Sequence, residues 1–96
     1  MSEKRAVFLK SLDDVVGEEN AKITLKCEAS KPRVSPIWRK DGTVLVASSK
    51  YELLQTGKAL GLTIHDLTKG DAGEYSCDLG TDLAKSKVTV RGNKTI

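Results

Sequence analysis

The stretch "DAGEYSC", Asp71 to Cys77, places a tyrosine two residues before a cysteine and an aspartate four residues before that tyrosine. Alternate side chains of a β-strand point to the same side, so Tyr75 and Cys77 face together. A cysteine at this position could be a nucleophile, a metal ligand or half of a disulfide. Each role requires different residues elsewhere, so the rest of the chain has to decide among them.

Two earlier residues belong with this stretch. Trp38 follows Cys27 by eleven residues, and Cys77 lies fifty residues beyond Cys27. Both cysteines have the inward parity of their strands, so two sheets packed face to face would bring the sulfurs within reach of each other. The large indole of Trp38 would fill the space beside them. These three residues therefore predict the centre of a two-layered β-structure.

Alternating polarity recurs along the chain in short runs with turn residues between them. The clearest runs are "AKITLKCEA" (21–29), "LGLTIHDL" (60–67) and "LAKSKVTVR" (83–91). Turns are predicted around Gly42, Gly57 and Gly80. The residues expected to face inward are Ala21, Ile23, Leu25, Cys27 and Ala29 in the first run, Leu60, Leu62 and Ile64 in the second, and Ala84, Ser86, Val88 and Val90 in the third.

No window has a convincing helical period of apolar residues. Seven or more short strands in 96 residues predict an all-β domain, either a sandwich or a barrel.

Composition limits the class of protein. The chain carries 16 basic and 13 acidic residues, a net charge of +3, and the two signs alternate, which argues against a nucleic-acid or membrane partner. Its apolar runs are far shorter than the roughly 20 residues needed to cross a bilayer. We expect one domain over residues 6–91, with residues 1–5 and 92–96 as flexible ends or linker remnants.

Tyr75 has the position of a tyrosine corner, in which the phenol reaches back to a backbone group a few residues upstream. We expect Asp71 to accept hydrogen bonds at this corner. Gly73 would let the backbone turn without a Cβ clash.

At this point the sequence resembles the intermediate-set immunoglobulin domains of giant muscle scaffold proteins, most closely obscurin, with obscurin-like protein and titin next. The resemblance runs from Phe8 to Val90. It rests on "GEENAKITLKCE" (17–28), "WRKDG" (38–42), "YELLQTGKALGLTIHDL" (51–67) and "DAGEYSC" (71–77). It implies an immunoglobulin-like β-sandwich of two antiparallel sheets with Greek-key connections, in which the first and last strands pair.

The sequence departs from the family pattern at two positions. Pro36 stands two residues before Trp38, where a β-branched residue is usual, so we expect that strand to start late or to bulge. Gly70 stands before Asp71, where an acidic residue is common, which would loosen the corner without removing it.

Once a metal site and a catalytic role are set aside, two alternatives remain for the cysteines, a disulfide or two free thiols. A metal site would need further ligands at short spacing, and the one histidine, His65, has outward parity. A catalytic Cys77 would need a base in a wet pocket, but it faces the core. A Cys27–Cys77 disulfide would stabilise the domain by roughly 4 kcal/mol if oxidised, whereas the resemblance to cytosolic muscle proteins implies two packed thiols. We expect no metal and no cofactor.

The leading functional hypothesis, implied by the resemblance, is a non-enzymatic module of a cytoplasmic sarcomeric scaffold that acts as a spacer and docks partners. Its partners would be titin, myomesin or another sarcomeric protein, with neighbouring immunoglobulin domains in the same chain, and the isolated domain would be monomeric. The alternative is an extracellular adhesion or receptor domain that binds a protein ligand. The residues expected to matter structurally are Cys27, Trp38, Asp71, Gly73, Tyr75 and Cys77.

A candidate partner face follows from strand parity. Ile37 is outward next to inward Trp38, and the sheet that bears it also presents Arg39, Glu74, Ser76 and Lys87. A second surface pairs opposite charges, because acidic residues near the start and basic residues of the last strand would lie side by side. We interpret that second surface as solvated and self-neutralising.

Overall fold

The computed structural model describes residues 6–92. Nearly all of its regular structure is β, and the one helix is a short 3₁₀ turn. In chain order the elements are β1 (Phe8–Lys10), β2 (Val15–Glu18), β3 (Ile23–Ala29), β4 (Ile37–Lys40), β5 (Thr43–Val44), β6 (Tyr51–Thr56), β7 (Ala59–Ile64), the 3₁₀ turn η1 (Lys69–Asp71), β8 (Gly73–Asp78) and β9 (Leu83–Arg91).

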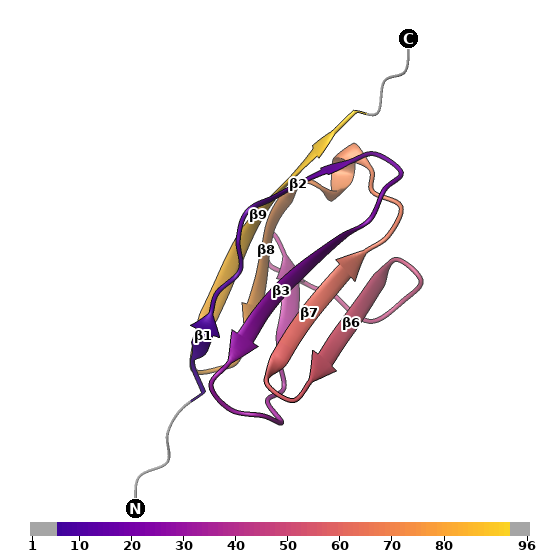
Figure 1. Ribbon diagram of the computed structural model, residues 1–96. Coiled ribbons are helices and arrows are strands. Elements are labelled where there is room, and N and C mark those ends of the chain that lie inside the picture. The colour runs from indigo at the N-terminus through magenta and orange to yellow at the C-terminus, as the bar shows by residue number, and fades with distance from the viewer. Residues whose placement is uncertain (1–5, 93–96) are drawn as a thin grey trace, which may run out of the picture.

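The strands form two sheets that pack face to face (Figure 1). One sheet has four strands in the order β1-β3-β7-β6, and the other has five in the order β2-β9-β8-β4-β5. The chain crosses between the sheets after β1, β2, β3, β5 and β7, which produces the interleaved connections of a Greek key. The predicted all-β sandwich of two sheets is confirmed.

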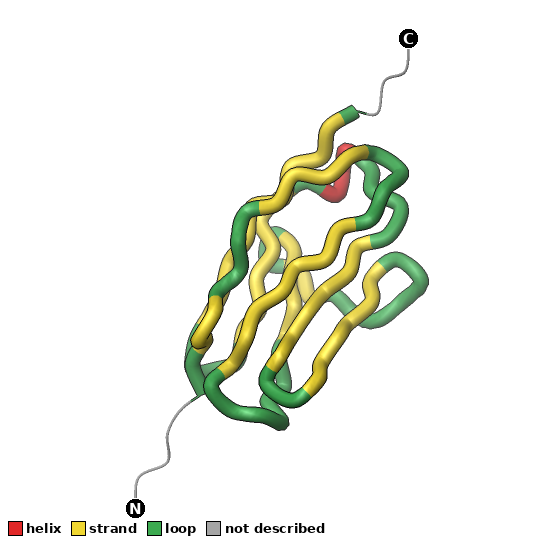
Figure 2. Tube along the Cα trace, viewed as in Figure 1, coloured by secondary structure: helices red, strands yellow, loops and turns green. Residues whose placement is uncertain are grey.

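One strand pair departs from the expected antiparallel pairing. β2 runs parallel to β9, with Val15 opposite Val88 and Glu18 opposite Arg91, while the other pairs are antiparallel. The cause is the N-terminal segment, which pairs with β3 as β1 and then passes to the edge of the second sheet without reversing direction (Figure 2). The early strand β2 and the last strand β9 therefore lie side by side, as expected, but they point the same way.

The core follows the predicted alternation. In β3 the side chains of Leu25, Cys27 and Ala29 are buried and those of Lys26 and Glu28 are exposed. The buried apolar residues are Leu12, Leu25, Cys27, Ala29, Trp38, Leu60, Leu62, Ile64, Leu67, Tyr75, Cys77, Ala84 and Val88. One inward assignment was wrong. Ala21 is exposed, because it lies in the loop before β3 and donates its amide to the Glu18 carbonyl, 3.1 Å away.

Turn chemistry fixes the hairpins. Asp41 and Gly42 join β4 to β5 and both have positive φ, 49° and 89°, as a type I′ turn requires. Gly57 has φ 59° between β6 and β7. β4 begins at Ile37, directly after Pro36, so this strand starts late, in agreement with the sequence.

Candidate interaction surface

Trp38 lies at the centre of the sandwich with 2% of its surface exposed. It stands opposite Cys77 on the neighbouring strand β8, and Cys27 reaches in from β3 of the other sheet. Both cysteines are buried free thiols. A hydrogen bond with Cys27, followed by burial, raises the pKa of Cys77 above that of an ordinary thiol. Both sulfurs lie in the core, away from solvent, where a thiol is a poor nucleophile.

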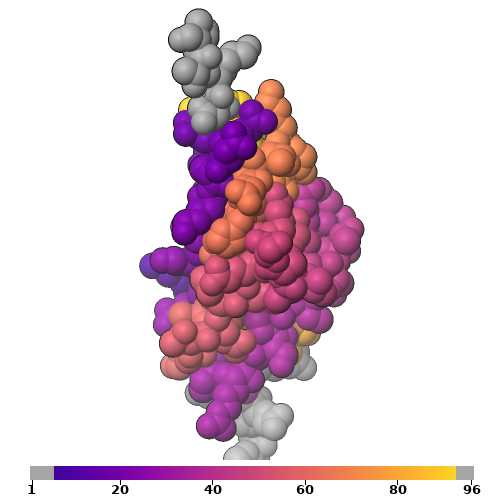
Figure 3. Space-filling view, turned by 90° about the vertical axis from the view of Figure 1, so that its right-hand side faces the viewer, coloured from indigo at the N-terminus to yellow at the C-terminus, as the bar shows by residue number. Residues whose placement is uncertain are grey.

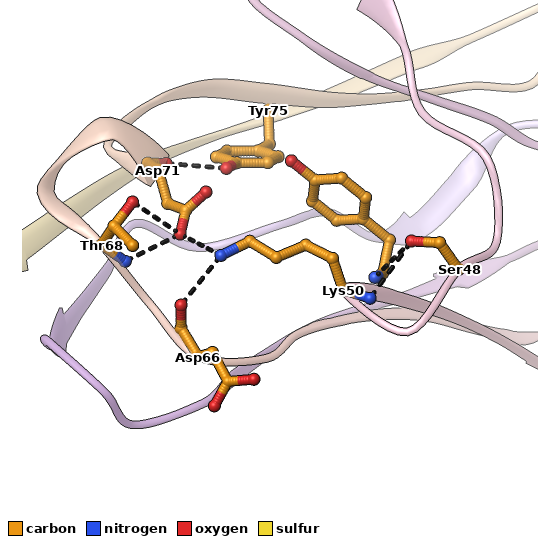
Figure 4. Close-up of polar contacts among 7 residues, drawn as sticks. Ser48, Lys50, Asp66, Thr68, Asp71 and Tyr75 are labelled. Atoms are coloured by element: carbon orange, nitrogen blue, oxygen red, sulfur yellow. Dashed lines mark hydrogen bonds and ion pairs between the residues drawn. The ribbon is translucent and has the colours of Figure 1, made fainter.

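The corner entering β8 is held by hydrogen bonds from side chain to backbone. The Tyr75 hydroxyl donates to the carbonyl oxygen of Asp71 at 2.7 Å, four residues upstream (Figure 4). The phenol is fully buried, and burial raises the pKa of Tyr75. Its hydroxyl therefore stays protonated and remains a donor across the ordinary pH range.

The carboxylate of Asp71 is the hub of this corner. Its Oδ2 accepts from the Thr68 amide at 2.8 Å, from the Thr68 hydroxyl at 3.2 Å and from Lys50 Nζ at 2.5 Å. Lys50 also donates to the carbonyl of Asp66 at 2.9 Å. Burial alone would raise the pKa of Asp71, but the bonds from Lys50 and Thr68 outweigh it and hold that pKa below its usual range.

We call Lys50, Asp66, Thr68, Asp71 and Tyr75 the corner network (Figure 4). It joins the loop before β6 to the loop before β8. The sequence indicated Asp71 and Tyr75 but not Lys50, which stands 21 residues from Asp71 in a polar loop. Nothing in the local sequence indicates that a lysine in such a loop will reach a buried aspartate in another loop.

Gly73 lies where a side chain would collide with Asp41. A Cβ at this position would be 2.6 Å from Asp41 Oδ2. The same carboxylate accepts the Glu74 amide through Oδ1 at 3.0 Å, which, with Lys40, lowers the pKa of Asp41. The β4–β5 turn is thereby tied to the start of β8. The sequence indicated Asp41 only as a turn residue.

The five residues of the candidate partner face lie together on the outside of the five-stranded sheet. Register places Arg39 opposite Ser76, and Glu74 opposite Lys87. Ile37 is 43% exposed. We call this surface the outer face: Ile37, Arg39, Glu74, Ser76 and Lys87.

The structure adds three neighbours to the outer face. Asp78 stands opposite both Ile37 and Leu83, and its Oδ2 accepts from Arg39 Nη1 at 2.8 Å. This bond is the first cause of the lowered pKa of Asp78. Val44 stands opposite Arg39 at the β5 edge, and both Val44 and Leu83 are exposed. The outer face therefore combines exposed apolar side chains with charges that are held in place.

Opposite charges were expected to lie side by side between the acidic segment near the start of the chain and the last strand, β9. The structure shows a different contact there. The contact found is between the Lys87 amide and Asp14 Oδ1, at 3.0 Å, so a carboxylate caps a backbone donor at the sheet edge. Farther along the same pair, Glu18 and Arg91 stand opposite each other. His65, expected at the surface, contacts Glu52 at 3.1 Å.

Among residues 6–92, no group of three or more His, Cys, Asp or Glu side chains has an arrangement that could hold a metal ion. In the same part of the chain, no helix has the length and apolar character needed to cross a membrane.

The sandwich, its central tryptophan and its tyrosine corner define a class of domain. The sequence matches the family described as immunoglobulin I-set domain over residues 6–91, and the chain belongs to that family. The predicted family membership is confirmed.

Particular relatives come from muscle proteins. The chain is 32% identical to human cardiac-type myosin-binding protein C over 97 residues, and 32% identical to the chicken protein over 76 residues. These alignments cover 94% and 79% of the chain, but only 8% and 6% of the relatives. The chain therefore spans a small part of the proteins that it matches.

Solved structures show the same fold. Domain I10 of titin superposes with a TM-score of 0.87 at 25% identity, covering 92% of this chain and all of that one. One domain in a complex of titin M10 with obscurin-like 1 superposes with a TM-score of 0.85 at 27% identity, covering 96% and 98% of the two chains. An immunoglobulin-like domain of human obscurin-like protein 1 reaches 0.88 at 23% identity, covering all of this chain and 94% of that one.

Proposed function

We propose that this chain is a non-enzymatic spacer and docking module within a longer cytoplasmic scaffold of the sarcomere. Its neighbours in that scaffold would be further immunoglobulin domains, and its partners would be proteins such as titin or myomesin. Support comes from the I-set family and from the relatives, which are myosin-binding protein C and domains of titin and obscurin-like protein.

The path of the chain supports the spacer role. The described residues begin at one end of the sandwich beside β1 and finish at the opposite end of β9 (Figure 1). Domains linked through such ends can follow one another in a line. Tension applied at the two ends loads the parallel β2–β9 pair in shear, so its hydrogen bonds share the force instead of opening one at a time.

The docking role rests on the outer face, and the exposure of Ile37 among charged neighbours carries it. The five-stranded sheet presents Ile37 beside the Arg39–Asp78 ion pair, with Glu74 and Lys87 farther along. An apolar centre with a polar rim is the usual composition of a specific protein interface. One similar structure is itself a complex of two such proteins, titin M10 and obscurin-like 1.

Amide shift mapping by NMR tests the docking role. The isotope-labelled domain would be titrated with titin and myomesin fragments, and we expect the largest changes at Ile37, Arg39 and Lys87. Replacing Ile37→Asp should weaken binding, while the matched change Leu9→Asp, at an exposed residue of β1, should not. Changes confined to Glu52 and His65 would reject the outer face.

Thiol labelling tests the compartment. Protein purified from its native source and unfolded in the presence of a thiol reagent should be labelled at both Cys27 and Cys77, because a reducing cytosol keeps the buried pair reduced. Protection of both residues until a reductant is added would favour the extracellular alternative.

A further inference from the structure

The four edge strands of the sandwich differ in length. β1, β2 and β5 have three, four and two residues, whereas β6 has six. Proteins usually protect long edges with charges, proline or bulges. β6 reads "YELLQT", which has one charge, at Glu52, and no proline. It is therefore the least protected edge among the described residues.

Register decides which backbone groups of β6 point away from the sheet. The turn between β6 and β7 has two residues, so Thr56 and Ala59 form a hydrogen-bonded pair, and alternate residues of β6 present their N–H and C=O groups outward. The outward residues are Tyr51, Leu53 and Gln55. Ser48 satisfies Tyr51, by donating its amide to the Tyr51 carbonyl at 2.9 Å and accepting the Tyr51 amide through Oγ at 3.2 Å.

Leu53 and Gln55 have no such partner. Both residues occupy non-hydrogen-bonded positions of the β6–β7 ladder, and within residues 6–92 no other group hydrogen-bonds to the N–H or C=O of either one. Four backbone groups, two donors and two acceptors, are thus arranged at the spacing of a β-ladder. Such a row pairs with an extended chain.

A pocket lies directly beside this row. It has a volume of about 260 Å³ and is lined by Val34, Pro36 and Trp38 on one side and by Leu53 and Gln55 on the other. Gln55 Nε2 donates to the Val34 carbonyl at 2.7 Å across its rim. Figure 3 faces this side of the molecule, where residues of the thirties, forties and fifties meet at the surface. One apolar side chain of an added strand would enter the pocket.

The other side of β6 is mixed in charge. Leu54 stands opposite Gly61, which in turn stands opposite Lys26 on β3, two strands in from the edge. Because Gly61 has no side chain, Leu54 and Lys26 line one shallow apolar hollow above it. Glu52 lies on the same face of β6 as Leu54. The outward residues of an added strand would therefore meet Leu54 and Glu52, and this side sets no charge requirement.

We propose that the β6 edge binds an extended peptide segment of a partner protein that carries an apolar residue facing the pocket. The peptide adds a strand through Leu53 and Gln55 and places that apolar side chain in the pocket beside Trp38. This site is separate from the outer face and does not depend on the proposed function.

Peptide selection tests the proposal. A displayed library of random peptides, long enough to pair with the six residues of β6, would be selected on the domain and counter-selected on a Leu53→Pro variant. That variant loses a donor that faces solvent, so the β6–β7 ladder is retained. We expect enriched peptides to share an apolar residue at one position, and to shift the amides of Leu53 and Gln55 and the indole of Trp38 in NMR spectra.

Two further variants guard against loss of folding as the explanation. Leu53→Glu keeps the backbone but puts a charge at the edge, and it should weaken binding by about tenfold or more. The matched change Val16→Glu, at an exposed residue of the β2 edge, should leave binding unchanged. Circular dichroism and Tm would establish that each variant is folded.

Three results would overturn the proposal. The first is that no sequence is enriched. The second is that the selected peptides share no apolar position or shift residues of the outer face instead. The third is concentration-dependent dimerisation through Leu53, which would assign the edge to a second copy of this chain.

Discussion

The corner network and the outer face both include residues of the segment from Asp71 to Cys77, but their carboxylates differ in burial. Asp71 is almost wholly buried and accepts three hydrogen bonds through one oxygen. Glu74, three residues later, is exposed on the outer face opposite Lys87. Burial makes the first carboxylate expensive to leave unpaired, so its partners are fixed, whereas water solvates the second. The first carboxylate serves the fold, and the second remains available to a partner.

The largest expected difference comes from removing each carboxylate. Asp71→Ala should lower the free energy of unfolding by about 2–3 kcal/mol, because it removes charge-assisted bonds and leaves the Thr68 amide without its acceptor. Glu74→Ala, a surface change, should stay within about 0.5 kcal/mol. Urea unfolding of the two variants measures both values. Similar losses would show that burial does not separate the two positions.

The phenol of the corner should matter less than its carboxylate. Tyr75→Phe removes a neutral hydrogen bond to the buried Asp71 carbonyl and keeps the ring, so we expect a loss of about 1–2 kcal/mol in urea unfolding. Ser76→Ala, at the next residue on the outer face, is the matched control and should be nearly neutral. A neutral Tyr75→Phe would mean that water replaces the phenol at that carbonyl.

Acidification should remove only the part of the stabilisation by the corner network that depends on the ionised Asp71 carboxylate. The folded pKa of Asp71 lies below its unfolded value of about 3.9, so its contribution is complete above that pH and is lost as the pH falls through the folded pKa. Urea midpoints measured from neutral pH downward should therefore fall below about pH 4.

Two amide variants assign this acid transition. Asp71→Asn should flatten the dependence of the urea midpoint on pH more than Asp78→Asn. The pKa of Asp78 is also lowered, chiefly by Arg39, but Asp78 is far more exposed than Asp71. Equal flattening by the two variants would place the acid-sensitive charge outside the corner.

Local patterns in the sequence predicted which residues are buried, but not which residues far apart in the chain come into contact. Period-two alternation identified Leu25, Cys27 and the other inward residues, because burial on one face of a strand has a local signature. The direction of β2 has no such local signature, because it depends on where the N-terminal segment crosses between the sheets. Lys50 was missed for a similar reason, because the fold of two loops brings it to Asp71.

For the surface, the sequence predicted only which side of its strand each residue faces. Alternation placed Ile37 and Arg39 on the outside of their sheet, as the structure does. Their neighbours Asp78 and Val44 depend on strand register, which the hairpin lengths and the opposing sheet determine. The β6 edge was beyond the sequence altogether, since an edge exists only once the order of strands is known.

The smallest expected effect on stability belongs to the ion pair of the outer face. Arg39→Ala breaks the 2.8 Å contact with Asp78, yet both side chains keep about a third of their surface in water, so the loss should be about 0–1 kcal/mol in urea unfolding. The same change should weaken partner binding much more than it weakens folding, because a partner that covers the outer face removes the water that otherwise solvates Asp78. Titration calorimetry with a titin or myomesin fragment, beside urea unfolding, separates these two quantities. A variant that loses stability but not affinity would place Arg39 with the corner network as a residue of the fold.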